Sequence, residues 1–150
     1  SEVDGFLGRL CRRAAGLYCA HPEARIAYVH AVTLPTAMRG LLPYLEASES
    51  REAALAVLQA VAALHAIYGE CDGIEATSAQ STVSIDEEIL RTAESWDEIR
   101  YRAACSIQEH AIKMAEACLR ADRQGPDPIY RIAAADAAIR LEGTRSTGGC

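Results

Sequence analysis

The sequence predicts an all-α protein, an array of about six or seven helices packed around one core. Apolar residues recur at spacings of three and four almost throughout the chain, and no alternating strand pattern of useful length appears. Half of the 150 residues are hydrophobic, but only 5% are aromatic, and alanine is abundant. Small side chains of this kind suit close helix–helix packing better than a sheet core.

The N-terminal part contains three predicted helical segments separated by prolines. Helical spacing of apolar residues predicts a helix over residues 2–20, which ends before Pro22 because proline cannot donate a helical hydrogen bond. The helical pattern resumes over residues 23–34. Pro35 then predicts a break or kink, followed by a short helix over residues 35–46.

The middle of the chain contains one long apolar helix and then a polar stretch. Ser48 or Ser50 is a suitable cap for a helix that runs to about Tyr68 and stops at Gly69. Residues 70–82, ECDGIEATSAQST, have no apolar period and predict a mobile loop.

The last third carries clear signals for helix starts. Ser84 and Ser95 are each followed three residues later by a glutamate, which is the capping-box pattern. The first box predicts a short helix, and the second opens a long helix over residues 96–122. Asp127, followed by a proline, caps a final helix that ends near residue 142.

Length and composition place the chain in one domain, because 150 residues lie within the usual range of about 100–200 residues. Residues 1–141 are predicted to form a single helical domain. Residues 142–150, EGTRSTGGC, predict a flexible tail.

Charge and cysteine usage limit the partners and the compartment. A net charge of −6 argues against a nucleic-acid or anionic-membrane surface, which needs a basic face. The longest apolar run, residues 53–68, is interrupted by polar residues and is shorter than the roughly 20 residues of a membrane span. Six cysteines without a CxxC pair or signal peptide indicate a reducing cytoplasm. We therefore expect a cytoplasmic protein with no nucleic-acid or membrane partner.

Three of the four histidines lie inside predicted helices. His30, His65 and His110 each share a helix face with apolar residues, so we expect them to point toward packed surfaces. His21, in the break before Pro22, is expected to be exposed. A lone histidine on an apolar face is commonly a core residue with one hydrogen-bond partner. Imidazole is also a common metal ligand, and helical bundles build metal sites from facing helices, so both interpretations stay open.

Lys113 is the only lysine among 15 lysines and arginines. Glu109, four residues earlier, offers a surface ion pair worth about 0.2–0.5 kcal/mol. An arginine would serve that pair equally well, whereas lysine alone can lose its proton when buried. The neutral amine can take up carbon dioxide to give a carbamate, a carboxylate-like metal ligand. His110 lies about 60° away around the helix, so both side chains can address one site.

A different class of protein also fits these residues: a non-catalytic helical subunit that binds a partner protein or an apolar ligand. In that case the histidines are core residues and Lys113 simply pairs with Glu109. The chain contains no HExxH, ExxH or GxSxG motif and no Gly-rich phosphate loop, so a hydrolase or nucleotide enzyme has no support.

Two stretches resemble one known family. YVHAVTLPTAMRGLLPYL, residues 28–45, and WDEIRYRAACSIQEHAIKMAEACLRADRQGPDPIYRIAAADAAIRL, residues 96–141, are similar to the C-terminal part of questin oxidase-like proteins. The recurrent pieces are a His-Ala-Val-Thr helix leading to Leu-Leu-Pro, and a later Glu-His-x-Ile-Lys helix followed by Glu-Ala-Cys. The resemblance covers most of residues 24–141, with matching order and spacing.

The resemblance implies an oxygenase. The family is associated with oxidative C–C ring cleavage of anthraquinones and related aromatic polyketides, with a Baeyer–Villiger-like outcome, at a non-haem Fe(II) centre that uses dioxygen. Carried over to this chain, His30 and His110 are expected iron ligands and Lys113 a ligand as its carbamate, with His65 as a second-tier ligand. Arg39 is expected to contact a phenolate or quinone oxygen of the substrate. NADPH or another reductant is a further expected cofactor.

The chain departs from the family in length. Family members are several hundred residues long, and their N-terminal half supplies further histidines. This chain corresponds to the C-terminal half of such a unit, which leaves three alternatives open. It pairs with a second polypeptide that carries the N-terminal half, it is a fragment of a longer chain, or it has lost the activity.

Overall fold

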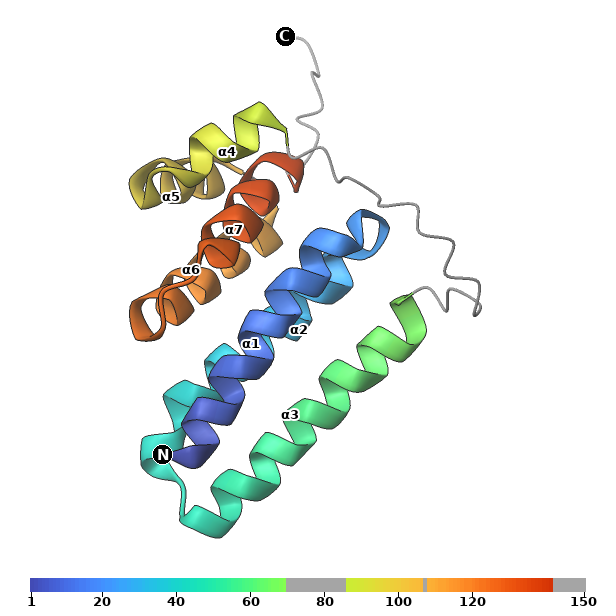
Figure 1. Ribbon diagram of the computed structural model, residues 1–150, viewed down its shortest axis with the longest axis vertical. Coiled ribbons are helices and arrows are strands. Elements are labelled where there is room, and N and C mark those ends of the chain that lie inside the picture. The colour runs from blue at the N-terminus through green and yellow to red at the C-terminus, as the bar shows by residue number, and fades with distance from the viewer. Residues whose placement is uncertain (70–85, 107, 142–150) are drawn as a thin grey trace, which may run out of the picture.

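The computed structural model describes residues 1–69, 86–106 and 108–141 (Figure 1). Every regular element in these ranges is helical, which confirms the predicted all-α class and the expected number of helices. The helices are α1 (Glu2–Ala20), α2 (Arg25–Leu41), α3 (Ala47–Tyr68), α4 (Glu87–Ala93), α5 (Trp96–Cys105), α6 (Glu109–Gln124) and α7 (Pro128–Arg140), with short 3-10 turns at Pro22–Ala24 and Leu42–Tyr44.

Four helices form the centre of the molecule. Helix α1 packs against α2, α2 against α6, α6 against α7, and α7 again against α1, so these four helices close a ring of seams (Figure 1). Helix α3 lies against α2 and α1 on one side of this four-helix core. Helices α4 and α5 cover α7 on the other side, and α5 also packs on α6.

Helix α7 is the most enclosed element of the bundle, because α1, α4, α5 and α6 all pack against it. Six consecutive residues of α7, from 133 to 138, are buried, and five of them are alanines. A helix with methyl side chains can accept neighbours on several sides at short range. The abundance of alanine in the sequence therefore reflects a helix that is surrounded rather than one with a single buried stripe.

Several predicted helix ends are confirmed. Helix α1 ends at Ala20, directly before the His21–Pro22 pair. Helix α3 ends at Gly69, whose N–H donates to the carbonyl of His65 at 2.7 Å. The Ser95 hydroxyl caps α5, and the Asp127 carboxylate accepts from the N–H of Ile129 to cap α7.

One predicted helix is wrong, and one predicted break is absent. The sequence predicts one helix over residues 96–122, but Ser106 adopts an extended backbone and separates α5 from α6. The Ser106 hydroxyl then accepts from the N–H of Gln108, which stabilises the break locally. Of the two outcomes predicted for Pro35, the break is absent, because α2 continues through this residue to Leu41, whereas the kink stays a prediction. Pro35 is fully buried, so its packing outweighs the lost helical hydrogen bond.

Two helix caps differ from the predicted serines. The backbone N–H of Glu46 donates to the Glu49 carboxylate at the start of α3, so the cap lies ahead of Ser48 and Ser50. Asp86 caps α4 by accepting from the N–H of Glu88. The predicted cap at Ser84, the loop over residues 70–82 and the tail over residues 142–150 lie outside the described residues.

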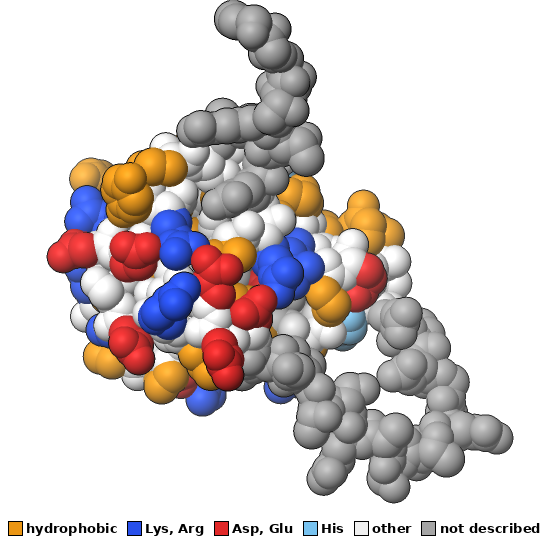
Figure 2. All heavy atoms as spheres, turned by 90° about the horizontal axis from the view of Figure 1, so that it is seen from above, with side chains coloured by type: hydrophobic (Ala, Val, Ile, Leu, Met, Phe, Trp, Pro, Cys, Tyr) orange, Lys and Arg blue, Asp and Glu red, His pale blue; other side chains and the backbone are white. Residues whose placement is uncertain are grey.

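The end of the molecule that carries α4 and α5 presents both signs of charge. Acidic and basic side chains alternate on this face rather than forming a field of one sign (Figure 2). Arg102 illustrates the pattern, because it binds both Glu88 and Glu98 at 2.6 and 2.7 Å. Among the described helices, none combines the length and the apolar character needed to cross a membrane.

Candidate functional site

The two histidines expected to share a metal ion lie side by side. His30 belongs to α2 and His110 to α6, and their ring centroids are 5.3 Å apart with the planes nearly perpendicular. The pair forms because α2 packs against α6 in the four-helix core. The Gln108 side-chain oxygen lies 3.1 Å from Nδ1 of His110. With that oxygen as acceptor, Nδ1 carries the proton and the Nε2 lone pair is available for a ligand.

Lys113 lies on the same helix as His110 and forms an ion pair. Its Nζ is 2.8 Å from Oε1 of Glu109, and the two side chains are 47% and 67% exposed. The surface ion pair that the sequence offers is therefore present. The Lys113 ammonium lowers the pKa of the Glu109 carboxyl, mainly through this hydrogen bond, with smaller contributions from His110 and His30. Glu109 thus lies within electrostatic range of both histidines.

His65 belongs to a second cluster. Its Nδ1 is 2.7 Å from the hydroxyl of Tyr28. His21 stacks on the Tyr28 ring with centroids 5.0 Å apart and meets His65 edge-on at 5.8 Å. Burial raises the pKa of the Tyr28 hydroxyl. Neither Tyr28 nor His21 was predicted to neighbour His65, although His21 lies at the turn that brings α1 back onto α2.

Two expectations about histidine exposure are wrong. His30 and His65 are exposed and His110 is half-buried, although all three were expected to face packed surfaces. The buried stripe of α2 runs through Tyr28, Val29 and Val32, and His30 lies at its edge. His21, expected to be exposed, has a side chain only 18% exposed because it stacks on Tyr28.

Arg39 is engaged within the fold. Its guanidinium donates two hydrogen bonds to the Asp4 carboxylate, at 2.7 and 2.9 Å, and its side chain is 10% exposed. This bidentate contact ties α2 to the first turn of α1. It lowers the pKa of Asp4, chiefly through the hydrogen bond from Arg39. The expected contact of Arg39 with a substrate oxygen stays a prediction, and it requires sharing the guanidinium with Asp4.

The candidate metal centre is partial within the described part of the chain. No group of three or more His, Cys, Asp or Glu side chains among residues 1–69, 86–106 and 108–141 could hold a metal ion. Of the four ligands expected, His30 and His110 lie together, Lys113 lies on the same helix as His110, and His65 lies with Tyr28. Non-haem iron sites commonly use two histidines and one carboxylate. The two paired histidines fit that set but do not complete it.

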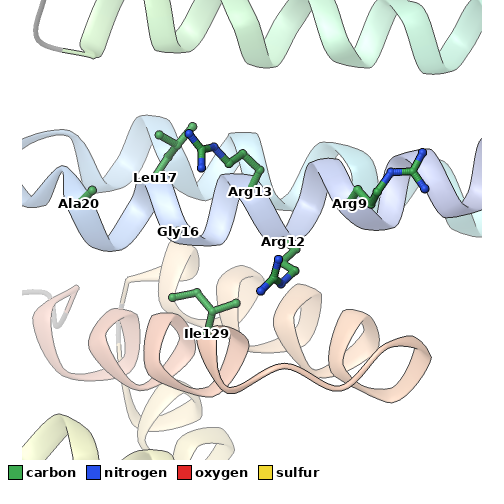
Figure 3. A pocket seen from close by; sticks show the side chains of 7 residues that line it. All are labelled: Arg9, Arg12, Arg13, Gly16, Leu17, Ala20 and Ile129. Atoms are coloured by element: carbon green, nitrogen blue, oxygen red, sulfur yellow. The ribbon is translucent and has the colours of Figure 1, made fainter.

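A groove lies along α1 beside α7. It has a volume of about 650 Å³ and is lined by six residues of α1 and by Ile129 of α7. Arg12 points toward α7 and pairs with Asp127, whereas Arg13 lies back along α1 beside Leu17 (Figure 3). The groove therefore has a basic half and an apolar half.

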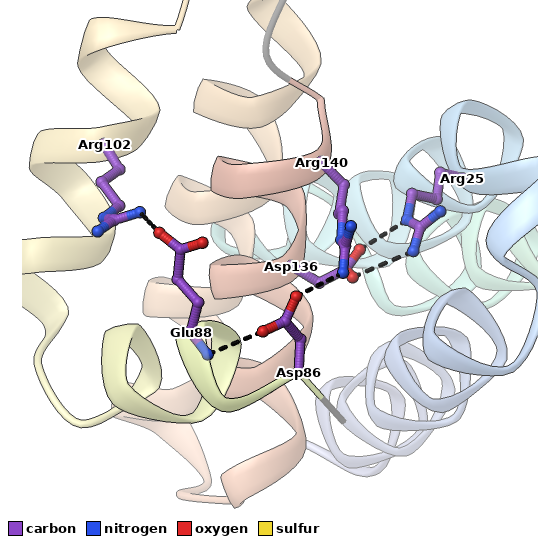
Figure 4. A network of polar contacts seen from close by, with 6 residues as sticks. All are labelled: Arg25, Asp86, Glu88, Arg102, Asp136 and Arg140. Atoms are coloured by element: carbon purple, nitrogen blue, oxygen red, sulfur yellow. Dashed lines mark hydrogen bonds and ion pairs between the residues drawn. The ribbon is translucent and has the colours of Figure 1, made fainter. Parts of the chain in front are cut away.

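A buried carboxylate connects α7 to α1 and to the start of α2. Asp136 accepts from the Tyr18 hydroxyl at 2.8 Å and from two nitrogens of Arg25 at 2.7 and 3.1 Å. Arg140, one turn further along α7, forms a separate pair with Asp86 at 2.8 Å (Figure 4). Burial and the Asp136 charge raise the pKa of Tyr18, so its hydroxyl stays a donor.

The fold and this geometry define a helical protein that presents a pair of histidines across two helices of a four-helix core. No family model, curated protein or solved structure matches the chain.

Proposed function

We propose that the chain is a subunit or fragment of a non-haem iron, dioxygen-dependent oxygenase. Its reaction would be the oxidative C–C ring cleavage of an anthraquinone or related aromatic polyketide, with a Baeyer–Villiger-like outcome. One observation carries the proposal: His30 and His110, the two ligands expected from separate stretches of sequence, have ring centroids 5.3 Å apart. Histidines that serve only in packing on two different helices would not be expected to lie side by side.

His30 and His110 would hold the ion, and Gln108 would fix the ring orientation and tautomer of His110. Bound Fe(II) would supply the activation of dioxygen next to the electron-rich ring. Lys113 would join as its carbamate, which forms when the neutral amine adds to carbon dioxide and releases a proton. That step requires Lys113 to leave Glu109, and the exposed position of both side chains makes this separation inexpensive.

The remaining ligands would come from a second polypeptide or from beyond the described residues. His30 and His110 alone are fewer than the three protein ligands that comparable iron sites use, and Lys113 is paired with Glu109 in this structure. A second chain carrying the N-terminal half of a questin oxidase-like unit would supply them, together with a wall of the substrate pocket. His65 stays a second-tier ligand, and the electron source, NADPH or another reductant, stays open.

Metal analysis of the natural complex tests this proposal. We expect near-stoichiometric iron in the purified protein with its companion chain, and loss of iron in His30→Ala and His110→Ala. His21→Ala is the matched control, because it removes an imidazole from the other cluster. Absence of any transition metal near stoichiometric level from the wild-type complex would overturn the proposal.

A second candidate function, a non-catalytic subunit that binds a partner protein, is favoured by α3. This 22-residue helix packs only one face against α2 and α1, and four of its residues are buried. Leu55, Ile67 and Tyr68 are exposed, and Ile67 is 72% exposed. Ile67 and Tyr68 are neighbours at the end of α3, and exposed apolar residues that lie together are found at protein interfaces. A stable heteromer that contains no metal, and that Ile67→Glu dissociates, would favour this function over the oxygenase.

A further inference from the structure

The groove over α1 continues into a second hollow between α1, α4 and α7. The two have volumes of about 650 and 340 Å³, and both are lined by Gly16, Ala20 and Ile129. We call the continuous depression the α1–α7 hollow. Such volumes lie within the range of about 300–1,000 Å³ that is typical of small-molecule sites. The hollow follows the α1–α7 seam, opposite the α2–α6 seam that carries His30 and His110, so it is independent of the proposed function.

The lining of the α1–α7 hollow is mostly apolar beside α4, and α1 contributes only small residues there. Ile89 of α4 and Ile129 and Ile132 of α7 supply its wall, while α1 contributes Gly16 and Ala20. A Cβ atom built on Gly16 would meet no other atom within 4 Å, which shows open space above this position. An apolar body can therefore lie flat on α1 and touch the three isoleucines.

The polar groups of the hollow are unevenly neutralised. Five arginines line it, and three of them are held by carboxylates of the fold: Arg12 by Asp127, Arg25 by Asp136 and Arg140 by Asp86. Among the ion pairs and hydrogen bonds of the described residues, none involves Arg9 or Arg13. These two lie one helical turn apart on the same face of α1, where like charges repel. In a chain of net charge −6, this mouth of the hollow stands out as basic.

We propose that the α1–α7 hollow binds a small amphipathic carboxylate. Arg13 binds the carboxylate, because the guanidinium group matches a carboxylate in geometry and charge. The Arg9 side chain extends the other way along α1 and adds positive charge at the mouth of the hollow (Figure 3). The apolar body passes over Gly16 and lies against Ile129 and Ile132.

Among the described residues, the part of the hollow away from Arg9 and Arg13 offers no free charge, so only the end with these two arginines suits the anionic head of a ligand. Cys19 lines the deeper part, and burial together with the Asp136 charge raises its pKa to about 11, so this thiol stays neutral near pH 7. Asp136 and Arg25 line the same part of the hollow and neutralise each other. A cationic head would meet the unpaired Arg9 and Arg13 and be repelled. An acidic helix of a partner protein is the competing occupant, and the test below separates the two.

Calorimetric titration of the full chain with decanoate tests the proposal, with decyltrimethylammonium as the cationic analogue of equal chain length. We expect saturable binding of decanoate with one site per chain and no binding of the cation. The double variant Arg9→Gln, Arg13→Gln should weaken decanoate binding by about tenfold or more. The matched control, Arg100→Gln with Arg123→Gln, makes the same change in net charge on α5 and α6 and should leave binding within about twofold.

Gly16→Leu tests the apolar lining without harming the fold. The new side chain enters the open space above Gly16, and leucine favours a helix more than glycine does. We expect loss of decanoate binding with an unchanged or higher Tm. Absence of saturable binding up to about 1 mM decanoate would overturn the proposal, as would binding that both variants leave unchanged. Failure to bind decanoate, combined with loss of a companion chain in Gly16→Leu, would assign the hollow to a partner helix instead.

Discussion

The ring of His110 on α6 meets the ring of His30 on α2 edge to face, with centroids 5.3 Å apart. Only the packing of α2 against α6 creates this relationship, since the two residues belong to distant parts of the chain. A divalent ion bound by both imidazoles would therefore bind the folded chain in preference to the unfolded one, and would stabilise the fold by mass action.

We predict that Zn²⁺ raises the Tm of the chain, and that His30→Ala and His110→Ala each abolish the increase. Zinc replaces iron in this measurement because it is redox-inactive and accepts imidazole ligands. His21→Ala should retain the increase, because His21 belongs to the Tyr28 cluster. A Tm that rises equally in all three variants would show that the ion binds elsewhere.

Lys113→Arg separates the stability of a surface ion pair from metal binding. Because Lys113 and Glu109 are both largely exposed, the free energy of unfolding should change by less than about 0.5 kcal/mol in urea titrations. Iron in the natural complex should nevertheless be lost, since a guanidinium cannot form a carbamate. Retention of iron in Lys113→Arg would remove the carbamate from the site and leave the two histidines.

Asp136 should be the most sensitive polar position of the fold. Asp136→Ala leaves Tyr18 and Arg25 without their acceptor inside the bundle. Since Arg25 keeps partial contact with water, we expect a loss near the lower end of the range for broken buried pairs, about 3 kcal/mol. Asp86→Asn is the matched control: it weakens the exposed pair with Arg140 but retains the α4 cap, and should cost less than about 1 kcal/mol. Equal losses in urea titrations would contradict the assigned role of Asp136.

The helices themselves were predictable because their signals are local. The proline after His21, the glycine at 69 and the caps at Ser95 and Asp127 each act on the backbone within a few residues. The failures at Pro35 and Ser106 depend on tertiary context. Burial retains Pro35 within α2, whereas the break at Ser106 interrupts an apolar period that continues on both sides.

The site was predictable only in part, because the sequence signals for it are local. Periodicity places His30 and His110 on particular helix faces, but it does not show which helices meet. Ile26, one helical turn before His30, is 40% exposed, so the face of α2 that carries His30 is not the face that packs in the core. The partnership of His65 with Tyr28 and His21 requires the path of the chain through the α1–α2 turn. No local pattern encodes that path.

Acid should weaken the tie between α1 and α2. Arg39 lowers the pKa of Asp4 in the folded chain, so the pair stabilises the fold at pH values above the unfolded pKa of about 3.9. This contribution is lost as the pH falls from about 4 through the lowered folded pKa. Asp4→Asn should therefore reduce the free energy of unfolding near neutral pH, by less than about 1 kcal/mol because the Asp4 side chain is 40% exposed.

The difference between Asp4→Asn and the wild type should vanish once the pH lies below the folded pKa of Asp4. Urea titrations at a series of pH values measure it. Glu116→Gln is a suitable comparison, since it removes an exposed pair with Arg120 within a single helix. A difference that persists unchanged into strong acid would show that Asp4 stabilises α1 by packing rather than by charge.

Thiol reactivity should report the packing of α1 and α6. Cys11 and Cys118 are buried, and Cys105 is exposed. Complete burial raises the pKa of Cys118 well above its usual range, and burial also raises that of Cys11. Because the thiolate is the reactive form, iodoacetamide at about pH 8 should modify Cys105 first among the four cysteines of the described residues. Cys19, with a pKa of about 11, should follow slowly.

Peptide mass mapping over time measures this order. Cys11 and Cys118 should react only when urea unfolds the chain, at rates that then approach that of Cys105. Their protection in the native state reflects the free energy of opening the four-helix core, because α1 and α6 carry these thiols on inner faces. Native alkylation of Cys118 as fast as that of Cys105 would mean that α6 separates readily from the bundle. The His30–His110 pair would then exist for only part of the time, which would contradict a preformed metal site.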